Sequence, residues 1–439
     1  MSEIKVKRLK KLQARLHVSG DKSISHRAAI LAGFASGKTR INGFLNSEDC
    51  LNTLHAMQAL GVETETLDET TFVLTGRSGN FLAPSEPLDC GNSGTSIRLL
   101  AGLLSGQSFD TRLFGDASLS KRPMKRIVEP LALMGGKITC EGSNLRPPLV
   151  VHGSPLRGIS YQTPIPSAQL KSALLLAGLQ AEGKTVIKES MHSRDHTERM
   201  LRHFHASTHQ DDTEVTVYGG HTLHAQDIQV PGDFSSAAFW IVAAAAFPKS
   251  RITLSCVGLN PTRTGLLNVL MRMGAQITET VESNGFEPYG TLRIHEGGSL
   301  KATTVGGKEI PNVIDELPIL AVAFALAEGT SVIKDAAELR VKETDRIAAL
   351  AVNLRAFGVE VEETPDGLVV HGGKPLKAAT VESFGDHRIA MAFTILGLFA
   401  EGTTVIQGTE CIATSYPLFE KHLNHVVRGE MEKNPTGKI

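Results

Sequence analysis

The chain has 439 residues, of which 41% are hydrophobic and 21% are charged, and its formal net charge is -1. This length favours two domains, because a single hydrophobic core stops growing at about 250–300 residues. The near-neutral charge argues against a general binder of nucleic acids or acidic membranes, and no apolar run is long enough to span a membrane. Five cysteines without CxxC or CxxH spacing fit reduced thiols better than a disulfide framework or a zinc site.

The two ends of the chain are polar. The N-terminus is basic, but no apolar core of a signal peptide follows it, so we expect a cytoplasmic protein. Ile4 and Val6 alternate with lysines, which predicts an edge strand whose lysines face water. Residues 428–439 are predicted to form a loose C-terminal tail.

One joint recurs six times along the chain, where an apolar helix of small residues ends and a strand begins. The joints are separated by gaps of 69, 77, 65, 81 and 73 residues and are centred on Gly37, Gly106, Gly183, Pro248, Gly329 and Gly402. We expect the glycine to form a left-handed cap of the helix, after which β-branched residues favour a strand. Six repeats predict two domains of three units each, with the boundary at the turn formed by residues 230–233.

The helix before each joint is apolar nearly all round, as in residues 237–247 and 389–399, so we expect it inside a domain. Most joints are followed by an amphipathic helix, such as residues 50–60 or 345–355, and then by a glycine turn and a strand. Each unit is therefore predicted to be a buried helix, a strand, an outer helix and further strands, with the sheets outside.

Polar residues come immediately before each buried helix. Lys22, Ser23 and Arg27 begin the first, where unpaired N–H groups and the helix dipole favour an anion such as phosphate. The other five starts are residues 89–98, 166–171, 231–236, 313–316 and 385–388. A capped helix with a solvated first turn would explain any one of them, but the recurrence favours a site. If the helices of a domain run parallel, their N-termini meet, and two such faces would form an anion-binding cleft with acid–base groups.

Two further basic stretches, residues 120–123 and 340–346, are each typical of a solvated helix face when taken alone. In the second of them, Lys342, Glu343 and Arg346 share one side of a helix through i, i+3 and i, i+4 spacing. A site role is allowed for both stretches.

Two patterns suggest functions that the sequence does not support. Residues 178–185 match the P-loop pattern, but a helix precedes the glycines and a strand follows, the reverse of the order that nucleotide binding requires. The histidine pairs His192/His196 and His203/His205 lack the further ligands that complete a metal set, so we interpret them as surface residues.

Four motifs, at residues 20–27, 91–98, 340–346 and 385–388, together resemble those of the EPSP synthase (3-phosphoshikimate 1-carboxyvinyltransferase) family, over roughly Leu12 to Val427. The resemblance implies an α/β fold, the two-domain inside-out α/β barrel of six repeated units, with pseudo-threefold symmetry in each domain. The first domain would be residues 20–231, and the second would be residues 1–19 and 232–427.

The implied reaction transfers the enolpyruvyl group of phosphoenolpyruvate to the 5-hydroxyl of shikimate 3-phosphate and releases phosphate, in the shikimate pathway of aromatic amino acid biosynthesis. It proceeds by addition and elimination through a tetrahedral intermediate. The resemblance implies a monomer that needs no metal or organic cofactor, with these two small molecules as its partners.

The resemblance also assigns roles residue by residue. Asp315 matches the base for the 5-hydroxyl, Glu343 matches the group that protonates the methylene carbon, and Lys22 would assist as an acid. The residues implied for shikimate 3-phosphate are Lys22, Ser23, Arg27, Ser167, Ala168, Gln169, Arg194, Asp315 and Lys342. Those implied for phosphoenolpyruvate are Lys22, Asn92, Gly94, Arg122, Gln169, Arg346 and Arg388.

The chain also departs from the family pattern. Thr414 stands where many members have a lysine, and it cannot supply that cation. Leu99 stands where one branch has proline, and Arg194 takes the place of a tyrosine that binds substrate. Gly94 is retained, which leaves room beside the phosphate of phosphoenolpyruvate.

Three alternatives stay open. The sister enzyme that transfers enolpyruvate to UDP-N-acetylglucosamine shares the fold, but the motifs at residues 21–27 and 342–346 favour the shikimate substrate. A non-catalytic anion-binding scaffold would not need Asp315 and Glu343 among so many cations. A P-loop kinase is disfavoured because a helix is expected before residues 178–185 and a strand after them, the reverse of the P-loop order.

Overall fold

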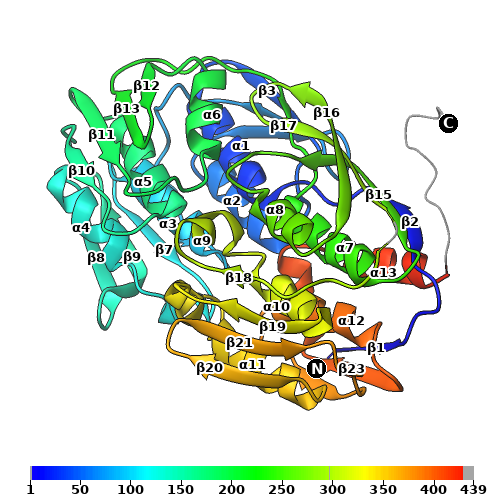
Figure 1. Ribbon diagram of the computed structural model, residues 1–439. Coiled ribbons are helices and arrows are strands. Elements are labelled where there is room, and N and C mark those ends of the chain that lie inside the picture. Colours follow the sequence, from blue (N-terminus) through cyan, green and yellow to red (C-terminus); the bar gives the residue numbers. More distant parts are fainter. Residues whose placement is uncertain (1, 296, 429–439) are drawn as a thin grey trace. The chain divides into compact units, whose positions relative to one another are not determined.

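The computed structural model describes residues 2–295 and 297–428 (Figure 1). The predicted tail therefore lies, beyond Arg428, outside the described residues. Contacts divide the chain into two compact units. The first unit is Gly20–Val230, and the second joins the chain up to Ser19 with the chain from Pro231 onward. The pseudo-threefold symmetry of each domain stays a prediction.

Six buried helices form the centres of the repeats in the described part of the chain, as the apolar segments predict. Those of the first unit are α1 (Lys22–Phe34), α3 (Gly94–Leu104) and α5 (Ala168–Gly178). Those of the second unit are α7 (Phe234–Ala246), α10 (Leu317–Leu326) and α12 (His387–Gly397). Every residue of α10 up to Ala325 is buried, so this helix contacts other parts of the protein on all sides.

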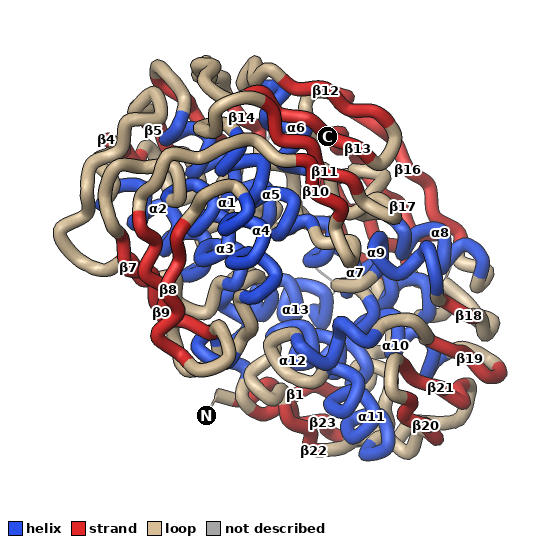
Figure 2. Tube along the Cα trace, turned by 90° about the vertical axis from the view of Figure 1, so that its left-hand side faces the viewer, coloured by secondary structure: helices blue, strands red, loops and turns tan. Residues whose placement is uncertain are grey.

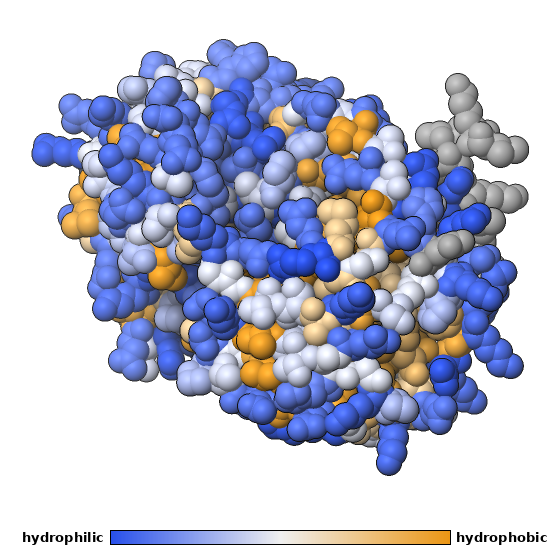
Figure 3. All heavy atoms as spheres, in the orientation of Figure 1, coloured by the Kyte–Doolittle hydropathy of each residue, from blue (hydrophilic) through white to orange (hydrophobic). Residues whose placement is uncertain are grey.

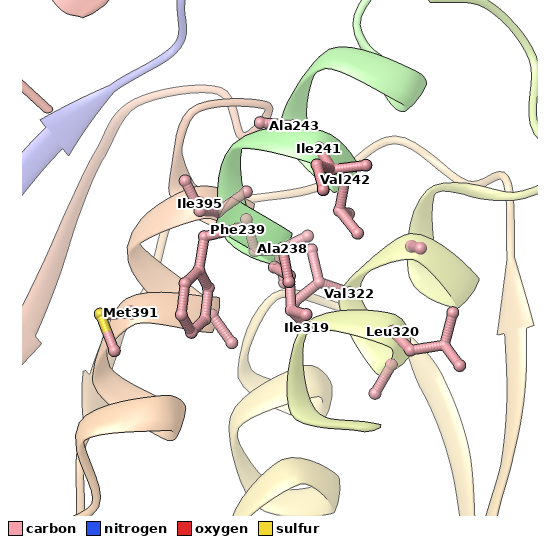
Figure 4. Packing of buried hydrophobic residues seen from close by; sticks show 14 of the residues in the cluster. Ala238, Phe239, Ile241, Val242, Ala243, Ile319, Leu320, Val322, Met391 and Ile395 are labelled. Carbon is pink, nitrogen blue, oxygen red and sulfur yellow. The ribbon is translucent and has the colours of Figure 1, made fainter. Parts of the chain in front are cut away.

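Small residues let these helices pack closely. A Cβ atom on Gly102 of α3 would lie 2.2 Å from the carbonyl oxygen of Ala173 on α5, so only glycine fits there. Figure 4 shows the corresponding core of the second unit, where Phe239 of α7 packs with Ile319 of α10 and Met391 of α12. Burial of apolar area in these contacts is the main stabilising term of each unit.

Sheets surround the buried helices, and the described residues form six of them (Figure 2). The strand that follows each buried helix pairs with a parallel neighbour on one side and an antiparallel neighbour on the other. The common plan confirms the repeat and the α/β fold class with its helices inside.

The sheets of the first unit are four-stranded. Their orders are β14 (Ile228–Gln229), β3 (Lys38–Asn42), β5 (Phe72–Thr75), β4 (Glu63–Thr66); β6 (Leu88–Asp89), β7 (Thr111–Phe114), β9 (Arg146–His152), β8 (Lys137–Gly142); and β10 (Ser160–Gln162), β11 (Lys184–Lys188), β13 (Glu214–Tyr218), β12 (Thr208–Asp211). Since α5 precedes β11, the P-loop-like residues 178–185 join a helix to a strand, as the sequence predicts.

The second unit has two four-stranded sheets and one three-stranded sheet. Their orders are β16 (Gln276–Asn284), β17 (Pro288–His295), β15 (Arg251–Gly258), β2 (Gln13–Leu16); β18 (Thr304–Val305), β19 (Gly329–Ile333), β21 (Gly367–Gly372), β20 (Glu360–Thr364); and β1 (Glu3–Lys7), β23 (Thr403–Gln407), β22 (Thr380–Glu382). The strand β1 is at the edge of its sheet with Ile4 and Val6 buried, as the alternation predicts.

Outer helices cover the repeats. They are α2 (Glu48–Ala59), α4 (Lys125–Leu133), α6 (His196–His203), α8 (Gly265–Arg272), α11 (Arg346–Ala356) and α13 (Phe419–Arg428). Hydrophilic residues cover most of the face shown in Figure 3. None of the helices in the described part of the chain is long and apolar enough to cross a membrane.

The prediction that a glycine caps each buried helix is wrong in its details. The cap of α1 is Ala35, and Gly37, at a φ of 106°, turns the chain two residues later, just before β3. The cap of α3 is Ser105, and Gly106 is not among the residues with positive φ. The left-handed residue at the fourth joint is Lys249, because proline cannot adopt positive φ.

A buried chain of hydrogen bonds anchors α13 to α7. The indole Nε1 of Trp240 donates to the hydroxyl of Tyr416 at 2.9 Å, and this hydroxyl lies 2.7 Å from Nδ1 of His422. All three side chains are buried. Burial, with help from the charges of Lys421 and His425, lowers the pKa of His422 to about 4. The folded protein therefore favours the neutral imidazole.

We expect His422 to make the protein less stable in acid. In the unfolded chain histidine has a pKa of about 6.5, so the unfolded state binds more protons as the pH falls from about 6.5 toward 4. The variant His422→Gln keeps a hydrogen-bonding side chain that does not titrate. The thermal unfolding midpoint of the wild type, relative to this variant, should be highest above pH 7 and fall steadily toward pH 4. A relative midpoint that is constant over this range would contradict the prediction.

Candidate active site

The start of α1 holds three of the predicted site residues. Asp21 caps the helix by accepting a hydrogen bond from the N–H of Ile24 at 2.9 Å. Lys22 is the first residue of α1, and its Nζ forms an ion pair with the buried carboxylate of Asp49. Asp49 belongs to α2, so an outer helix fixes the position of the Lys22 ammonium group.

The guanidinium of Arg27 is buried between three helices. Its Nε donates to Thr197 Oγ1 and its Nη2 to Ser172 Oγ, each at 2.7 Å, and its Nη1 donates to the carbonyl of Ser23 at 2.9 Å. Thr197 belongs to α6 and Ser172 to α5. The Arg27 side chain on α1 is therefore held by the two other helices.

The start of α3 combines an amide and two arginines. Arg122 Nη2 donates to Asn92 Oδ1 at 2.6 Å, and Asn92 Nδ2 donates to Asp116 Oδ2 at 2.7 Å. A Cβ atom on Gly94 would lie 2.9 Å from Arg98 Nη1 and 3.1 Å from Arg122 Nη1. Glycine at this position therefore leaves room for two guanidinium groups.

The start of α5 is joined to that of α3. Ser167 caps α5, and Ala168 and Gln169 are its first two residues. Gln169 Oε1 accepts from Arg98 Nη1 at 2.5 Å, and its Nε2 donates to Thr95 Oγ1 at 3.0 Å. The first turns of these two helices therefore lie side by side, as the predicted meeting of N-termini requires.

Buried His26 joins the start of α1 to α2 and α3. Its Nδ1 lies 2.7 Å from Thr53 Oγ1, and Thr53 Oγ1 lies 2.7 Å from Ser96 Oγ. Burial, together with the charges of Lys22 and Arg27, lowers the pKa of His26 well below its ordinary value. The neutral imidazole thus serves as a hydrogen-bonding link.

The interpretation of the paired histidines as surface residues is wrong for His196. This side chain is only 2% exposed, because it lies in the first turn of α6 against the core of the first unit. Among the described residues there is no group of three or more His, Cys, Asp and Glu side chains that could hold a metal ion.

Three carboxylates surround one guanidinium in the second unit. Arg346, the first residue of α11, is 1% exposed. Its Nε donates to Asp386 Oδ2 and its Nη2 to Glu343 Oε2, each at 2.7 Å, and its Nη1 lies 3.6 Å from Asp315 Oδ1. Burial alone would lower the pKa of Arg346, but Asp386 and Glu343 raise it above its ordinary value. The cation is therefore permanent.

Asp315 contacts a second cation. Arg388 Nη1 donates to the carbonyl of Asp315 at 2.9 Å, and its Nη2 lies 3.7 Å from Asp315 Oδ2. Lys342 Nζ lies 4.0 Å from Glu338 Oε1. Burial lowers the pKa of Lys342, while the carboxylates of Asp315 and Glu338 oppose that shift. The second unit therefore gathers Asp315, Lys342, Glu343, Arg346 and Arg388 in one cluster.

Arg194 and Thr414 lie outside the contacts described above. Arg194 is in the segment between β11 and α6. Thr414 ends a 3₁₀ turn, where its hydroxyl donates to the carbonyl of Cys411 at 2.8 Å and lies 3.4 Å from His387 Nδ1. Thr414 thus has a structural hydrogen bond at the position where the sequence pattern suggested a lysine.

Comparisons with known proteins agree with this geometry. The family model described as EPSP synthase (3-phosphoshikimate 1-carboxyvinyltransferase) matches residues 6–423. The chain belongs to the EPSP synthase family. It is 52% identical to the 3-phosphoshikimate 1-carboxyvinyltransferase of Akkermansia muciniphila, over 94% of this chain and 97% of that one, and 50% identical to that of Geobacter sulfurreducens, with the same coverage.

A solved structure of EPSP synthase from Acinetobacter baumannii has the same fold, with a TM-score of 0.87 and 42% identity over 97% of this chain and 98% of that chain. The family and the inside-out α/β fold predicted from the four motifs are both confirmed.

The sequence did not single out Asp386 as a member of this candidate site. Asp386 is fully buried, caps α12 by accepting from the N–H of Arg388 at 2.8 Å, and pairs with Arg346. Its motif, residues 385–388, was the available signal. Asp49 and His26 were missed because their partners are distant in the sequence.

The variant Asp386→Ala is expected to destabilise the second unit by about 3–5 kcal/mol, because it leaves the buried Arg346 guanidinium short of a partner and removes the cap of α12. Urea unfolding at neutral pH measures this change. The control Glu401→Ala breaks the exposed pair with Arg8 and should cost no more than about 1 kcal/mol. Equal stability of the two variants would refute a structural role for Asp386.

Proposed function

We propose that this chain transfers the enolpyruvyl group of phosphoenolpyruvate to the 5-hydroxyl of shikimate 3-phosphate and releases phosphate, as a cytoplasmic monomer without a cofactor. The observation that carries the proposal is the Arg346 guanidinium, which contacts Asp315, Glu343 and Asp386 at once. It puts two carboxylates with separate tasks, a base and a proton donor, beside one fixed cation.

The residues proposed for phosphoenolpyruvate supply positive charge for its phosphate and carboxylate groups. They are Lys22, Asn92, Gly94, Arg122 and Gln169 in the first unit and Arg346 and Arg388 in the second. Bidentate guanidinium groups suit both anions. The fixed positions of Arg122 and Arg346 support this role, because a cation that is already oriented costs less entropy on binding.

The residues proposed for shikimate 3-phosphate surround a phosphate and a set of hydroxyl groups. They are Lys22, Ser23, Arg27, Ser167, Ala168, Gln169 and Arg194 in the first unit and Asp315 and Lys342 in the second. The first turns of α1 and α5 add N–H groups and the positive ends of two helix dipoles. These groups suit a phosphate dianion.

In the proposed reaction Asp315 takes the proton of the 5-hydroxyl group, and the oxygen of that hydroxyl attacks the enol carbon of phosphoenolpyruvate. Glu343 gives a proton to the methylene carbon, which becomes a methyl group in the tetrahedral intermediate. Arg346 and Arg388 stabilise the negative charge near Asp315. In the elimination the methyl group gives one proton back to Glu343. The phosphate group then leaves, and Lys22 assists by donating a proton to it.

The direct test mixes the purified protein with phosphoenolpyruvate and shikimate 3-phosphate and follows the release of phosphate. Release that depends on both compounds is the expected result. Release with UDP-N-acetylglucosamine instead would assign the sister activity. No release with either acceptor would favour an anion-binding scaffold and would sink the proposal.

The variant Asp315→Ala should lower kcat by about 10²–10⁴-fold, the usual contribution of one general base, while it weakens the binding of either substrate much less. Steady-state kinetics for both substrates, together with binding titrations, separate the two effects. Glu360→Ala, which removes an exposed carboxylate paired with Lys374, is the control and should leave kcat unchanged. Near-normal turnover of the Asp315 variant would remove Asp315 from the catalytic role.

A further inference from the structure

One lysine and two glutamates form a buried ion cluster in the first unit, outside the residues proposed to touch substrate. Lys171 Nζ lies 2.6 Å from Glu189 Oε2 and 2.7 Å from Glu198 Oε1. Each of the three side chains is 4% exposed or less. Burial of such charges costs free energy that their pairing only partly offsets, so a buried ion cluster is weak evidence for stability. A different reason is needed for its presence here.

The cluster holds both backbone groups of Ser193. The N–H of Ser193 donates to Glu189 Oε2 at 3.2 Å, and its carbonyl accepts from Lys171 Nζ at 3.5 Å. Ser193 lies in the segment between β11 and α6, where no helix or strand fixes the backbone. The next residue is Arg194. The cluster therefore sets the backbone direction from which the Arg194 side chain extends.

The same cluster lies beside the contacts of Arg27. Glu198 follows Thr197 in the first turn of α6, and Lys171 precedes Ser172 on α5. The hydroxyl groups of Thr197 and Ser172 both accept hydrogen bonds from the Arg27 guanidinium. An ion cluster that joins α5 to α6 therefore also fixes the two hydroxyl groups that orient Arg27.

The charges of the cluster are consistent with such a fixed arrangement. Burial alone would lower the pKa of Lys171, but the carboxylates of Glu198 and Glu189 raise it above its ordinary value. The ammonium group thus keeps all three of its N–H donors for Glu189, Glu198 and the Ser193 carbonyl. Two residues proposed for phosphoenolpyruvate alone, Arg122 and Asn92, are held differently, since Arg122 donates to Asn92 and Asn92 donates to Asp116.

We propose that Lys171, Glu189 and Glu198 are positioning residues for the recognition of shikimate 3-phosphate, which hold Arg194 and Arg27 in the orientation that binds this substrate. The inference rests on the proposed function, because that function assigns Arg27 and Arg194 to shikimate 3-phosphate. None of the three cluster residues is among those proposed to contact either substrate. Its loss is expected to affect one substrate more than the other.

The experiment compares steady-state kinetics of Lys171→Met, Glu189→Ala and Glu189→Gln. The first two variants should raise KM for shikimate 3-phosphate about tenfold, since displacement of a binding group by about 1 Å is costly, and should leave KM for phosphoenolpyruvate within about twofold. Glu189→Gln keeps an acceptor for the Ser193 N–H, so it should restore much of the lost affinity. If Lys171→Met does not fold, the pair of Glu189 variants decides the question.

Lys188, which precedes Glu189 in the chain, provides a matched control. Lys188→Met removes the same charge from an exposed pair with Glu214 on the adjacent strand, and it should leave both KM values unchanged. Equal changes of both KM values in the cluster variants, or no rescue by glutamine, would reduce the cluster to a structural role and overturn the inference.

Arg194→Met separates this inference from the proposed function. If it raises KM for shikimate 3-phosphate while the cluster variants do not, the positioning role is wrong and the proposed site stands. If it has no effect, the proposed role of Arg194 is wrong, and the inference fails with it. If the wild type releases no phosphate from the two substrates, the proposed function itself fails.

Discussion

The structure depends on one constraint, which is that the N-terminal N–H groups of buried helices must find partners away from water. Five of the six buried helices are capped by a side chain that accepts a hydrogen bond from an N–H group of the first turn. The capping residues are Asp21, Ser93, Ser167, Asp233 and Asp386. Polar residues are therefore required where the apolar helices begin. The same places carry the positive ends of helix dipoles, so the structural requirement also provides groups that suit the anion binding proposed above.

The start of α10 lacks such a side-chain cap, and the difference matters for Asp315. Glu316 makes no capping hydrogen bond, but its carboxylate accepts from Ser235 at 2.5 Å and lies 3.4 Å from Arg263. Glu316 is thereby held by α7 and by the segment before α8. Its neighbour Asp315 is turned toward Arg346 and Arg388 instead. The two adjacent carboxylates therefore pair with different arginines, Glu316 with Arg263 and Asp315 with Arg346 and Arg388.

Local patterns allowed the repeat, the buried helices and the family to be predicted from the sequence, because each depends on residues within one turn or one strand. The prediction that Gly106 caps its helix is wrong, because packing against other segments sets where each helix ends. Asp386 and the Lys171 cluster were missed for a related reason. Their partners lie 40 and 18–27 residues away, and only the folded chain brings them together.

Thr414 shows how the two kinds of information combine. By resemblance to the family pattern, the sequence has threonine here in place of a lysine. In the structure the Thr414 hydroxyl donates a hydrogen bond to the carbonyl of Cys411. Arg346 and Arg388 supply positive charge in the second unit that does not depend on Thr414. Both arginines contact Asp315. The guanidinium group of arginine stays charged at neutral pH, so Asp315 keeps two cationic partners.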